Sequence, residues 1–518
     1  MSRLTSPVLR FLRQYGYQAL FVAIILIAIF FRFYKLNHLP PGLHPDEAAN
    51  GLDIFRMIEN HDFRPLYATN GPREALFFYL QAIFVLIMGN TITALRVAPA
   101  IIGTLGVVAT FLWARSWFGR RVAILAAFMM AVNPWAVTLS RDGFRASMTP
   151  LFVALSMWLF TKAIQKRSQK WWLLSGFWVG LGMYTYLSYR LFPAALLFML
   201  GYLFVFRRDF IKPYYRLIGV SLIGFVIALL PMGIFAIHHA GDVFARAAGT
   251  SFLNKNLNGG HPLQTLGTDL VKTALMFNVH GDENYRHNLG GQPELNFFVG
   301  LMFLIGIVIA LSHIWRPKYL ALLAVFGVMI MAEALTAEGI PHALRAIGVI
   351  PAVFILAGIG VSYVLDIWYQ TFPINSAARA SGMAMMLIPL TATLYQGYNQ
   401  YFVAWAKSPE TYQAYSEDAV AIANYLNSTA SVGERPVMID GYSDKTVYYI
   451  THKHSSYRRI EPSDVDSLSP DVKEIVIVNN YKDEALKKLK VKYPKARLVA
   501  HRSEFSGDEL FSVYEPIK

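Results

Sequence analysis

The stretch YQALFVAIILIAIFFRFYKLNHLPPGLHPDEAAN at residues 17–50 decides the fold class. Its first half is an almost unbroken apolar run from Tyr17 to Phe33, long enough for a membrane-spanning helix. Its second half is polar and ends in the adjacent acids Asp46 and Glu47. Acids are scarce in this chain, with 33 Asp and Glu among 518 residues, so a pair of them directly after a predicted span requires an explanation.

The composition of the whole chain predicts a polytopic membrane protein. Hydrophobic residues make up 55% of it, charged residues only 15%, and the mean hydropathy is +0.38. The net charge of +14 does not indicate nucleic-acid binding, because the basic residues lie between hydrophobic runs, as in loops at a cytoplasmic lipid surface. The absence of cysteine excludes a disulfide framework and thiolate chemistry.

The hydropathy pattern predicts about eleven transmembrane helices. They lie near residues 17–34, 97–114, 122–139, 146–164, 172–187, 191–206, 217–237, 297–313, 319–335, 346–366 and 381–396.

The distribution of basic residues predicts how these helices are oriented. Arg3, Arg10 and Arg13 precede the first span, no small-residue cleavage site follows it, and we expect an uncleaved signal anchor. The loops that would then be cytoplasmic are rich in Lys and Arg, whereas the short outer turns hold few, as the positive-inside rule requires. This orientation holds only if the apolar run from Ala75 to Gly89, about 15 residues long, does not cross the membrane, and its length suits an interfacial or re-entrant helix.

The sequence predicts two domains. Residues 1–396 form a membrane domain with external loops at 35–75 and 238–296, and residues 397–518 form a small soluble α/β domain. In this tail we expect strands at 436–440, 474–479, 496–501 and 511–516, and helices at 412–427 and 483–493. We therefore expect a multi-pass protein of the cell (plasma) membrane whose active surface and C-terminal domain are extracytoplasmic.

Several separate segments carry ionisable residues to this predicted outer face. Ionisable groups at membrane depth are costly, so such a gathering indicates a functional site. The candidates are the acids Asp46, Glu47 and Glu74, the arginines Arg73, Arg141, Arg145, Arg190, Arg286 and Arg345, and also Tyr186, His287 and His342.

This combination of residue types fits sugar transfer from a lipid-linked phosphate. Arginine holds phosphate through a planar fork that is always charged, and it can stabilise phosphate as a leaving group. A carboxylate can take the proton from an acceptor hydroxyl while the anomeric carbon becomes oxocarbenium-like. Both kinds of residue are present at the predicted outer face.

Three stretches also resemble a known class of enzymes. HPDEAANGLDIFRM (44–57), NGPREALFFYLQAIFVLIMG (70–89) and the segment 94–145 together resemble the GT-C class of membrane glycosyltransferases. Within that class they are most similar to the family 39 type, which includes the protein O-mannosyltransferases and more distant relatives such as the lipid A aminoarabinose transferase. The similarity covers about residues 17–200 and is weaker at GDENYRHN (281–288) and PHALRAIG (341–348).

The resemblance implies a GT-C fold and an inverting transfer of a hexose or pentose from a polyprenyl-phosphate donor. It implies that Asp46 is the catalytic carboxylate, with Glu47 beside it. Glu74 would occupy the position of a glutamate that precedes Lys-Pro-Pro in the aminoarabinose transferases. Here the segment 75–77 reads Ala-Leu-Phe, and the His-Pro-Pro of the mannosyltransferases is also absent, so neither donor nor acceptor specificity carries over.

Most candidates also have a purely structural explanation. Asp46 and Glu47 could fill the first turn of a helix that begins at Pro45, and Glu74 could pair locally with Arg73. Arg141, Arg190 and Arg345 could reach the outer lipid phosphates, the tyrosines could belong to an aromatic belt, and the histidines could be hydrogen-bonding loop residues. The acid pairs at 46/47 and at Asp282 and Glu283 could instead bind a divalent cation, and this alternative stays open.

A transporter or flippase of lipid-linked sugars is the main alternative function. It would also gather arginines in a membrane groove, but such proteins show related halves and broken helices, and we find no internal repeat. A non-enzymatic membrane scaffold does not account for the acid pair. The expected partners are a polyprenyl-phosphate sugar, membrane lipids and a glycan, lipid or protein acceptor of the cell envelope.

Overall fold

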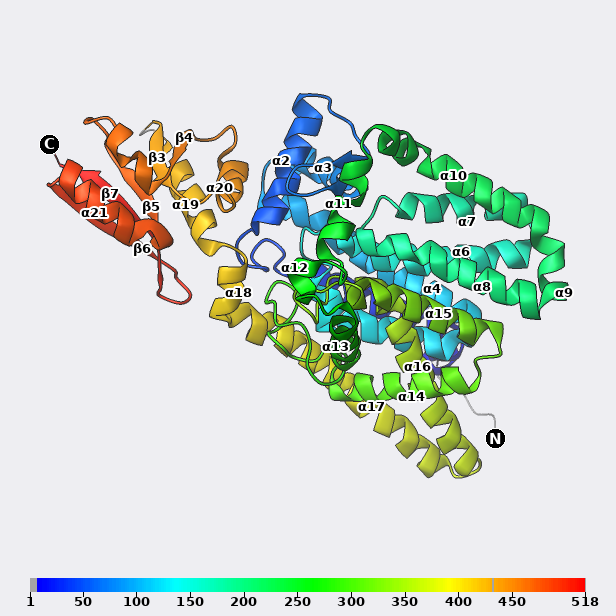
Figure 1. Cartoon of the computed structure of the whole chain (residues 1–518). Coiled ribbons are helices and arrows are strands. Elements are labelled where there is room, and N and C mark those ends of the chain that lie inside the picture. Colours follow the sequence, from blue (N-terminus) through cyan, green and yellow to red (C-terminus); the bar gives the residue numbers. More distant parts are fainter. Residues whose placement is uncertain (1–6, 431–432, 518) are drawn as a thin grey trace. The chain divides into compact units, whose positions relative to one another are not determined.

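The computed structural model describes residues 7–430 and 433–517 and consists mostly of helices (Figure 1). The helices of the apolar region are α1 (Pro7–Phe33), α3 (Leu76–Met88), α4 (Ile92–Val132), α5 (Pro134–Thr138), α6 (Thr149–Lys166), α7 (Gln169–Gly182), α8 (Phe192–Phe206), α9 (Arg208–Ile211), α10 (Tyr215–His238), α14 (Phe297–Ser312), α15 (Pro317–Ala334), α16 (Ile350–Thr371) and α17 (Ser376–Asn399). The other helices are α2 (Pro45–Glu59), α11 (Ala240–Thr250), α12 (Lys255–Asn258), α13 (Pro262–Leu275), α18 (Pro409–Ala414), α19 (Glu417–Ser428), α20 (Asp444–Thr451) and α21 (Lys482–Lys492). The strands are β1 (Leu66–Tyr67), β2 (Arg73–Glu74), β3 (Arg435–Met438), β4 (Tyr457–Ile460), β5 (Ile475–Val478), β6 (Ala496–Arg502) and β7 (Glu509–Pro516).

Eight helical segments in the described part of the chain are long and apolar enough to cross a membrane. The predicted hydrophobic segments all fall on helices, but those near 97–114 and 122–139 share the 41-residue helix α4. That helix is kinked at Gly119 (φ 88°, ψ −177°), a conformation that glycine adopts without a Cβ clash. The predicted class, a polytopic helical membrane protein with a small α/β tail, is confirmed. Arg3 of the predicted basic N-terminus lies outside the described residues.

The apolar run from Ala75 to Gly89 forms α3, a helix of 13 residues. A helix perpendicular to the bilayer needs about 20 residues to cross it. Helix α3 is therefore too short to span the membrane in that orientation, as we expected from the sequence. That it lies along the outer surface remains a prediction.

The chain folds into two compact units. The first consists of the residues up to Tyr34 together with Arg64–Phe77 and Pro99–Val403. The second consists of Lys35–Phe63, Phe78–Ala98 and the chain from Ala404 onward. The tail thus forms one unit with helix α2 and with the segment that precedes α4.

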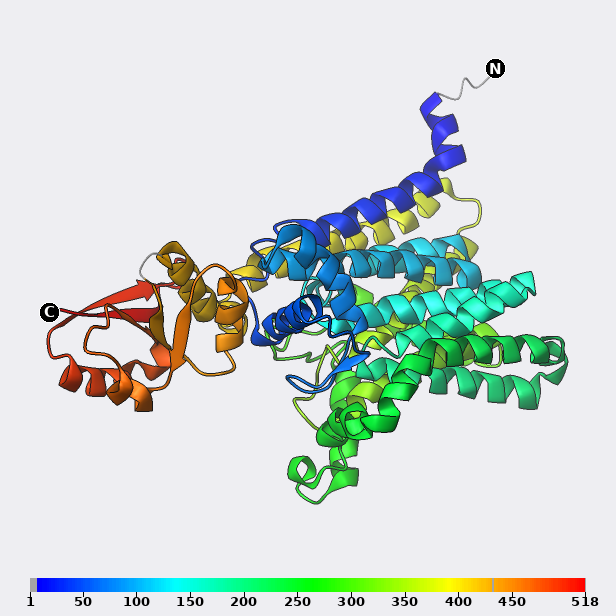
Figure 2. The same ribbon diagram turned by 90° about the horizontal axis from the view of Figure 1, so that it is seen from above.

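Close helix packing in the first unit depends on glycines. Helix α7 packs against α6 and α10, and these helices run side by side in both views (Figures 1 and 2). A Cβ atom on Gly176 would lie 1.7 Å from the carbonyl oxygen of Ser221 on α10. Similarly, a Cβ on Gly306 of α14 would lie 1.9 Å from the carbonyl oxygen of Leu356 on α16. Small residues let helix backbones approach in this way where lipid provides no hydrophobic driving force.

The tail is built on a five-stranded sheet with the strand order β4-β3-β5-β7-β6. Strands β4, β3 and β5 are parallel, whereas β7 is antiparallel to both β5 and β6. Alternate residues of the strands face opposite sides of the sheet. One side packs on α19, and its buried residues are Val437, Val476, Val513, Ile422 and Leu426. The other side packs on α21, and its buried residues are Met438, Ile477, Tyr514, Ala485 and Leu489.

The sequence predicted four of the five strands of this sheet. They are β3, β5, β6 and β7. The helix expected at 412–427 is instead two helices, α18 and α19, because Ser416 between them adopts a left-handed conformation (φ 51°). Strand β4 was not predicted, since its residues YRRI include two exposed arginines and lack an apolar pattern. Helix α20 was also missed.

Candidate functional site

Helix α2 begins at the predicted acid pair. Pro45 is its first residue, and the ring nitrogen Nδ1 of His44 accepts a hydrogen bond from the backbone N–H of Asp46 at 3.1 Å. The carboxylate of Glu47 accepts in return from the backbone N–H of His44 at 3.4 Å. This reciprocal capping box fixes the start of the helix. Both acids therefore lie at the positive end of the helix dipole, as expected for acids in a first helical turn.

Glu47 forms a closed ion pair with Arg96. The Nε and Nη2 atoms of Arg96 each donate to one carboxylate oxygen of Glu47 at 3.0 Å, and both side chains are fully buried. Arg96 also donates to the carbonyl oxygens of Pro40 at 2.6 Å and Gly42 at 2.9 Å. One positive and one negative charge thus cancel in the interior. This geometry supports the chain around the acid pair and favours a structural role for Glu47.

Asp46 is the accessible member of the pair. Its side chain is 37% exposed, and its Oδ1 atom accepts a hydrogen bond of 2.9 Å from the hydroxyl of Tyr442. The Nδ1 atom of His44 lies 3.8 Å from its Oδ2 atom. A carboxylate in this setting can be reached by a hydroxyl group from outside. Of the two acids, Asp46 is therefore the better candidate for a proton acceptor.

Glu74 lies at the end of strand β2 and is bound by two arginines. Its Oε2 atom accepts from Nε of Arg145 at 2.8 Å, and its Oε1 atom accepts from Nη2 of Arg190 at 2.9 Å. The arginines lie in short 3-10 turns, Arg145–Met148 and Leu187–Leu191, directly before α6 and α8. Burial alone would raise the pKa of Glu74, but the two guanidinium groups outweigh it and hold the pKa below its ordinary value. Glu74 is therefore ionised.

This cluster keeps an excess of positive charge. Two guanidinium groups face one carboxylate, and Arg190 also donates to the carbonyl oxygen of Val243 at 2.8 Å. The Nη2 atom of Arg145 is buried and has no hydrogen-bond partner within the residues that the structure describes. The guanidinium carbon of Arg145 lies 5.3 Å from the ring centre of the predicted residue Tyr186. A buried donor of this kind calls for an acceptor, and an anionic oxygen would match its charge.

Two other predicted arginines lie against backbone groups. Arg141 donates to the carbonyl oxygens of Phe31 at 2.9 Å and Tyr34 at 2.8 Å, and to the hydroxyl of Tyr401 at 2.9 Å. It is fully buried, so these bonds tie the end of α1 to neighbouring segments and favour a packing role. Arg73 donates through Nε to the carbonyl oxygen of Thr69 at 3.2 Å.

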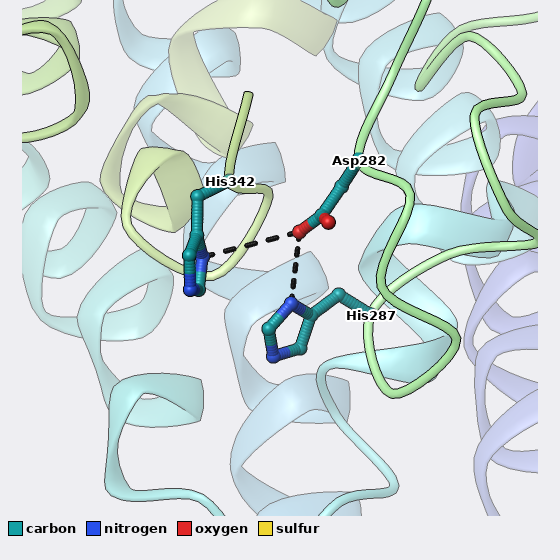
Figure 3. Close-up of side chains that lie close together, drawn as sticks. All are labelled: Asp282, His287 and His342. Atoms are coloured by element: carbon teal, nitrogen blue, oxygen red, sulfur yellow. Dashed lines mark hydrogen bonds and ion pairs between the residues drawn. The ribbon is translucent and has the colours of Figure 1, made fainter. Parts of the chain in front are cut away.

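A third cluster joins Asp282, His287 and His342, which point toward one another (Figure 3). The Oδ2 atom of Asp282 lies 2.8 Å from Nδ1 of His287 and 3.9 Å from Nδ1 of His342. The same oxygen accepts from the backbone N–H of Ala343 at 2.8 Å, and Oδ1 accepts from that of Asn284 at 2.8 Å. Burial lowers the pKa of His287 and lowers that of His342 well below its ordinary value. Both imidazoles are therefore neutral at pH 7.

The three residues of this cluster fit a divalent metal ion. One ligand atom from each lies within 4.8 Å of the other two, and Nδ1 of His342 is buried without a hydrogen-bond partner in the described part of the chain. Ligand atoms of a tetrahedral zinc site are about 3.3 Å apart, so small side-chain shifts would close the site. Of the predicted acid pairs, only Asp282 belongs to this cluster. Glu283 is exposed and pairs with His280 at 3.1 Å, and Asp46 and Glu47 have the partners given above.

A polar pocket of about 740 Å³ opens beside this cluster. Its lining includes Lys272, His280, Asp282, Arg286, His342 and Arg345. Arg345 donates to Thr336 Oγ1 at 3.0 Å and pairs with Glu338 at 2.9 Å, while Arg286 donates to Asn284 Oδ1 at 3.2 Å. The predicted residues of the two C-terminal motifs thus meet at one pocket, whose lining holds three basic side chains, Lys272, Arg286 and Arg345, and three acids, Asp282, Glu283 and Glu338.

Three residues that support these groups were not among the candidates. Arg96 is a single charge at the start of an apolar run, a signal that could have drawn attention to it. Tyr442 lies 396 residues from Asp46, and the sequence carries no sign of their contact. Glu294 accepts from the backbone N–H of Asp282 at 3.1 Å, and burial raises its pKa well above the ordinary value.

Part of the sequence matches a known enzyme family. Residues 72–233 match the family described as dolichyl-phosphate-mannose-protein mannosyltransferase. The chain is also 34% identical over 125 residues to a Bacillus subtilis protein, the provisionally named mannosyltransferase YkcB. That match covers 24% of this chain and 18% of YkcB.

The fold matches solved structures over nearly the whole chain. ArnT from Cupriavidus metallidurans bound to undecaprenyl phosphate is 15% identical, with a TM-score of 0.58 over 97% of this chain and 98% of ArnT. The oligosaccharyltransferase AglB from Archaeoglobus fulgidus, in complex with an inhibitory peptide and a dolichol-phosphate, is 14% identical, with a TM-score of 0.56 over 98% of this chain and 75% of AglB.

The fold is that of the GT-C membrane glycosyltransferases. The family match at residues 72–233, about a third of the chain, agrees with this fold. The resemblance inferred from the sequence motifs is thereby confirmed, and the chain is a multi-pass membrane protein.

Proposed function

We propose that this chain is an inverting glycosyltransferase that moves a sugar from a polyprenyl-phosphate donor to an acceptor hydroxyl on the outer face of the membrane. The observation that carries the proposal is the buried cluster of Glu74, Arg145 and Arg190, with its excess positive charge and its unpartnered donor. The family match and the lipid phosphates bound by ArnT and AglB support the same donor chemistry.

In this proposal Arg145 and Arg190 hold the donor phosphate. A guanidinium fork suits the tetrahedral phosphate oxygens, and it stabilises the negative charge that develops on the leaving phosphate. Glu74 fixes the orientation of both guanidinium groups, and its negative charge reduces the free energy needed to bury two cations. Tyr186 packs against Arg145 and limits its movement. The site therefore binds an anion without relying on flexible side chains.

Asp46 acts as the base. The acceptor oxygen attacks the anomeric carbon, its proton passes to the Asp46 carboxylate, and the bond between that carbon and the phosphate oxygen breaks. The lipid phosphate leaves with the electron pair of that bond. Because attack and departure occur on opposite faces of the sugar, the anomeric configuration inverts. Glu47 does not take part directly, since Arg96 neutralises it.

The pocket beside Asp282 suits the polar part of a substrate. Arg286, His342 and Arg345 line it, and they can donate hydrogen bonds to sugar hydroxyls or to an acidic acceptor. We place the pocket, Asp46 and the tail outside the membrane, in agreement with the distribution of basic residues.

The test uses the full chain in lipid nanodiscs with a labelled polyprenyl-phosphate sugar. Wild-type protein should bind undecaprenyl phosphate and release labelled sugar to an acceptor or to water. Arg145→Ala should bind the lipid phosphate more weakly, Arg145→Lys should be intermediate, and Arg208→Ala at an exposed site should behave like wild type. Equal binding by all four proteins would contradict the proposal. Movement of intact donor across a vesicle membrane without bond cleavage would favour a flippase instead.

A further inference from the structure

Helix α20 of the tail packs directly on helix α2, which carries Asp46. The two helices belong to the same compact unit, although almost 400 residues of sequence separate them. They approach so closely at Gly51 that a Cβ atom there would lie 2.2 Å from Cε2 of Tyr449. Phe55, one turn further along α2, stacks on the rings of Tyr449 at 5.3 Å and His452 at 4.3 Å. This interface is as tight as a protein core.

A second segment holds the other end of α20. The side-chain amide of Asn90 donates to the carbonyl oxygens of Tyr449 at 3.1 Å, Ile450 at 3.2 Å and His452 at 3.0 Å. These carbonyls lie at the C-terminus of α20, where helices leave acceptors unsatisfied. The hydroxyl of Tyr449 donates to the carbonyl oxygen of Thr91 at 3.3 Å. The helix is therefore fixed by α2 on one side and by the chain before α4 on the other.

The start of α20 and the loop before it contact the residues around the proposed base. The hydroxyl of Thr446 donates to the carbonyl oxygen of Leu43 at 3.0 Å, and both residues are buried. The hydroxyl of Tyr442 donates to Oδ1 of Asp46 at 2.9 Å. The Tyr442 ring also lies edge-to-face on the ring of His44, with centres 5.9 Å apart.

The loop that carries Tyr442 is itself well ordered by hydrogen bonds. It follows strand β3, and Oδ1 of Asp440 accepts from the backbone N–H groups of Tyr442 and Ser443, both at 2.9 Å. The ammonium group of Lys445 lies 4.7 Å from the centre of the Tyr442 ring. Loops at the carboxyl ends of parallel strands are where α/β sheets place functional groups. Tyr442 thus projects from a rigid edge of the tail sheet.

We propose that the β3, α20 and β4 unit of the tail is a positioning element for Asp46, and that Tyr442 is its positioning residue. The inference rests on the proposed role of Asp46 as the base. A hydroxyl bond to Oδ1 fixes the plane of the carboxylate, so the direction in which it meets an acceptor is also fixed. The tail would then act on the chemical step, in addition to any role in holding the acceptor.

The test compares two tyrosines of this region in the full chain. Tyr442→Phe removes only the hydroxyl that bonds Asp46. Tyr448→Phe is the matched control, because Tyr448 lies on α20 and is exposed. We expect Tyr442→Phe to lower kcat about three- to tenfold, the usual contribution of one hydrogen bond between solvent-exposed groups, with the KM for the donor unchanged. The control should keep wild-type kinetics.

A double substitution separates positioning from a general structural effect. In an Asp46→Asn background, Tyr442→Phe should cause no further loss, because the hydroxyl acts through the carboxylate. A further loss of the same size, or a wild-type kcat for Tyr442→Phe alone, would overturn the inference. Thr446→Val should also lower kcat, since it frees the carbonyl of Leu43 while preserving side-chain shape.

The two proposals fail in distinguishable ways. If Asp46→Asn retains wild-type turnover, the proposed function loses its base and the inference falls with it. If Asp46→Asn is inactive but Tyr442→Phe and Thr446→Val are both normal, the inference alone is wrong.

Discussion

Glu47 and Glu74 are both buried carboxylates bound by arginine, yet only Glu74 belongs to a cluster in which the arginines outnumber the carboxylates. Glu47 accepts from Arg96 through both of its carboxylate oxygens, and Arg96 also donates to two backbone carbonyls. Glu74 divides its oxygens between Arg145 and Arg190, and one nitrogen of Arg145 is left without a partner in the described chain.

The difference shows how to tell a structural pair from a binding site. Removing charges from water is costly, and a buried pair recovers that cost only when the charges balance and every donor is used. In the pair of Glu47 and Arg96 the charges balance and all three nitrogens of Arg96 donate hydrogen bonds, so the pair needs no ligand. The cluster around Glu74 meets neither condition, so a further anion would complete it. Counting charges and donors therefore separates two acids that look alike in the sequence.

Asp46 should give the largest effect on turnover. It stands beside Glu47 but has an accessible side chain, so Asp46→Asn should lower kcat by about 10²- to 10⁴-fold, the usual contribution of a positioned base. Folding and binding of undecaprenyl phosphate should persist, since Asn can still accept from Tyr442. Glu484→Gln, at an exposed acid on helix α21, is the control and should keep most activity. A normal kcat for Asp46→Asn would exclude it as the base.

Glu47→Gln and Glu74→Gln test the comparison directly. Glu47→Gln leaves the Arg96 charge buried and uncompensated, so the free energy of unfolding should fall by about 3–5 kcal/mol. Glu74→Gln should also destabilise the protein, but undecaprenyl phosphate should restore the loss because its phosphate can replace the missing negative charge. Denaturant or thermal unfolding with and without the lipid measures this. Rescue of both variants, or of neither, would remove the distinction.

Arg145 should have the next largest effect. Arg145→Ala removes a charged hydrogen bond to the donor phosphate, so the Kd for undecaprenyl phosphate should rise about 10- to 100-fold. Arg145→Lys keeps the charge but loses the planar guanidinium group that can donate two parallel hydrogen bonds. Its Kd should therefore lie between those of wild type and Arg145→Ala. A Kd that is the same for Arg, Lys and Ala at this position would leave Arg145 with a structural role only.

The sequence predicted the parts of this molecule that depend on local pattern. Long apolar runs became helices because lipid satisfies no backbone groups, and short apolar segments became β3, β5, β6 and β7. The position of Asp46 after the first span also followed from the motif. The sequence could not separate Asp46 from Glu47, because their difference arises from Arg96, which lies 49 residues away.

Other features depend on contacts between distant segments. Tyr442 meets Asp46 only because α20 packs on α2, and neither α20 nor β4 was predicted. The sequence placed Asp282 beside Glu283 as an acid pair. In the fold these side chains diverge, and Asp282 instead meets His342, 60 residues later, because Asp282 also binds the backbone of Ala343.

Asp282 extends the comparison to a carboxylate whose partners are neutral histidines. If the cluster holds a metal ion, Zn²⁺ at 100 times its Kd should stabilise the protein by about 2.7 kcal/mol and raise Tm by a few degrees. His287→Ala and His342→Ala should abolish this shift. His280→Ala is the matched control, because His280 lines the same pocket but is not part of the cluster. A Tm shift that survives both cluster variants, or none in wild type, would show that the histidines only pack and donate hydrogen bonds.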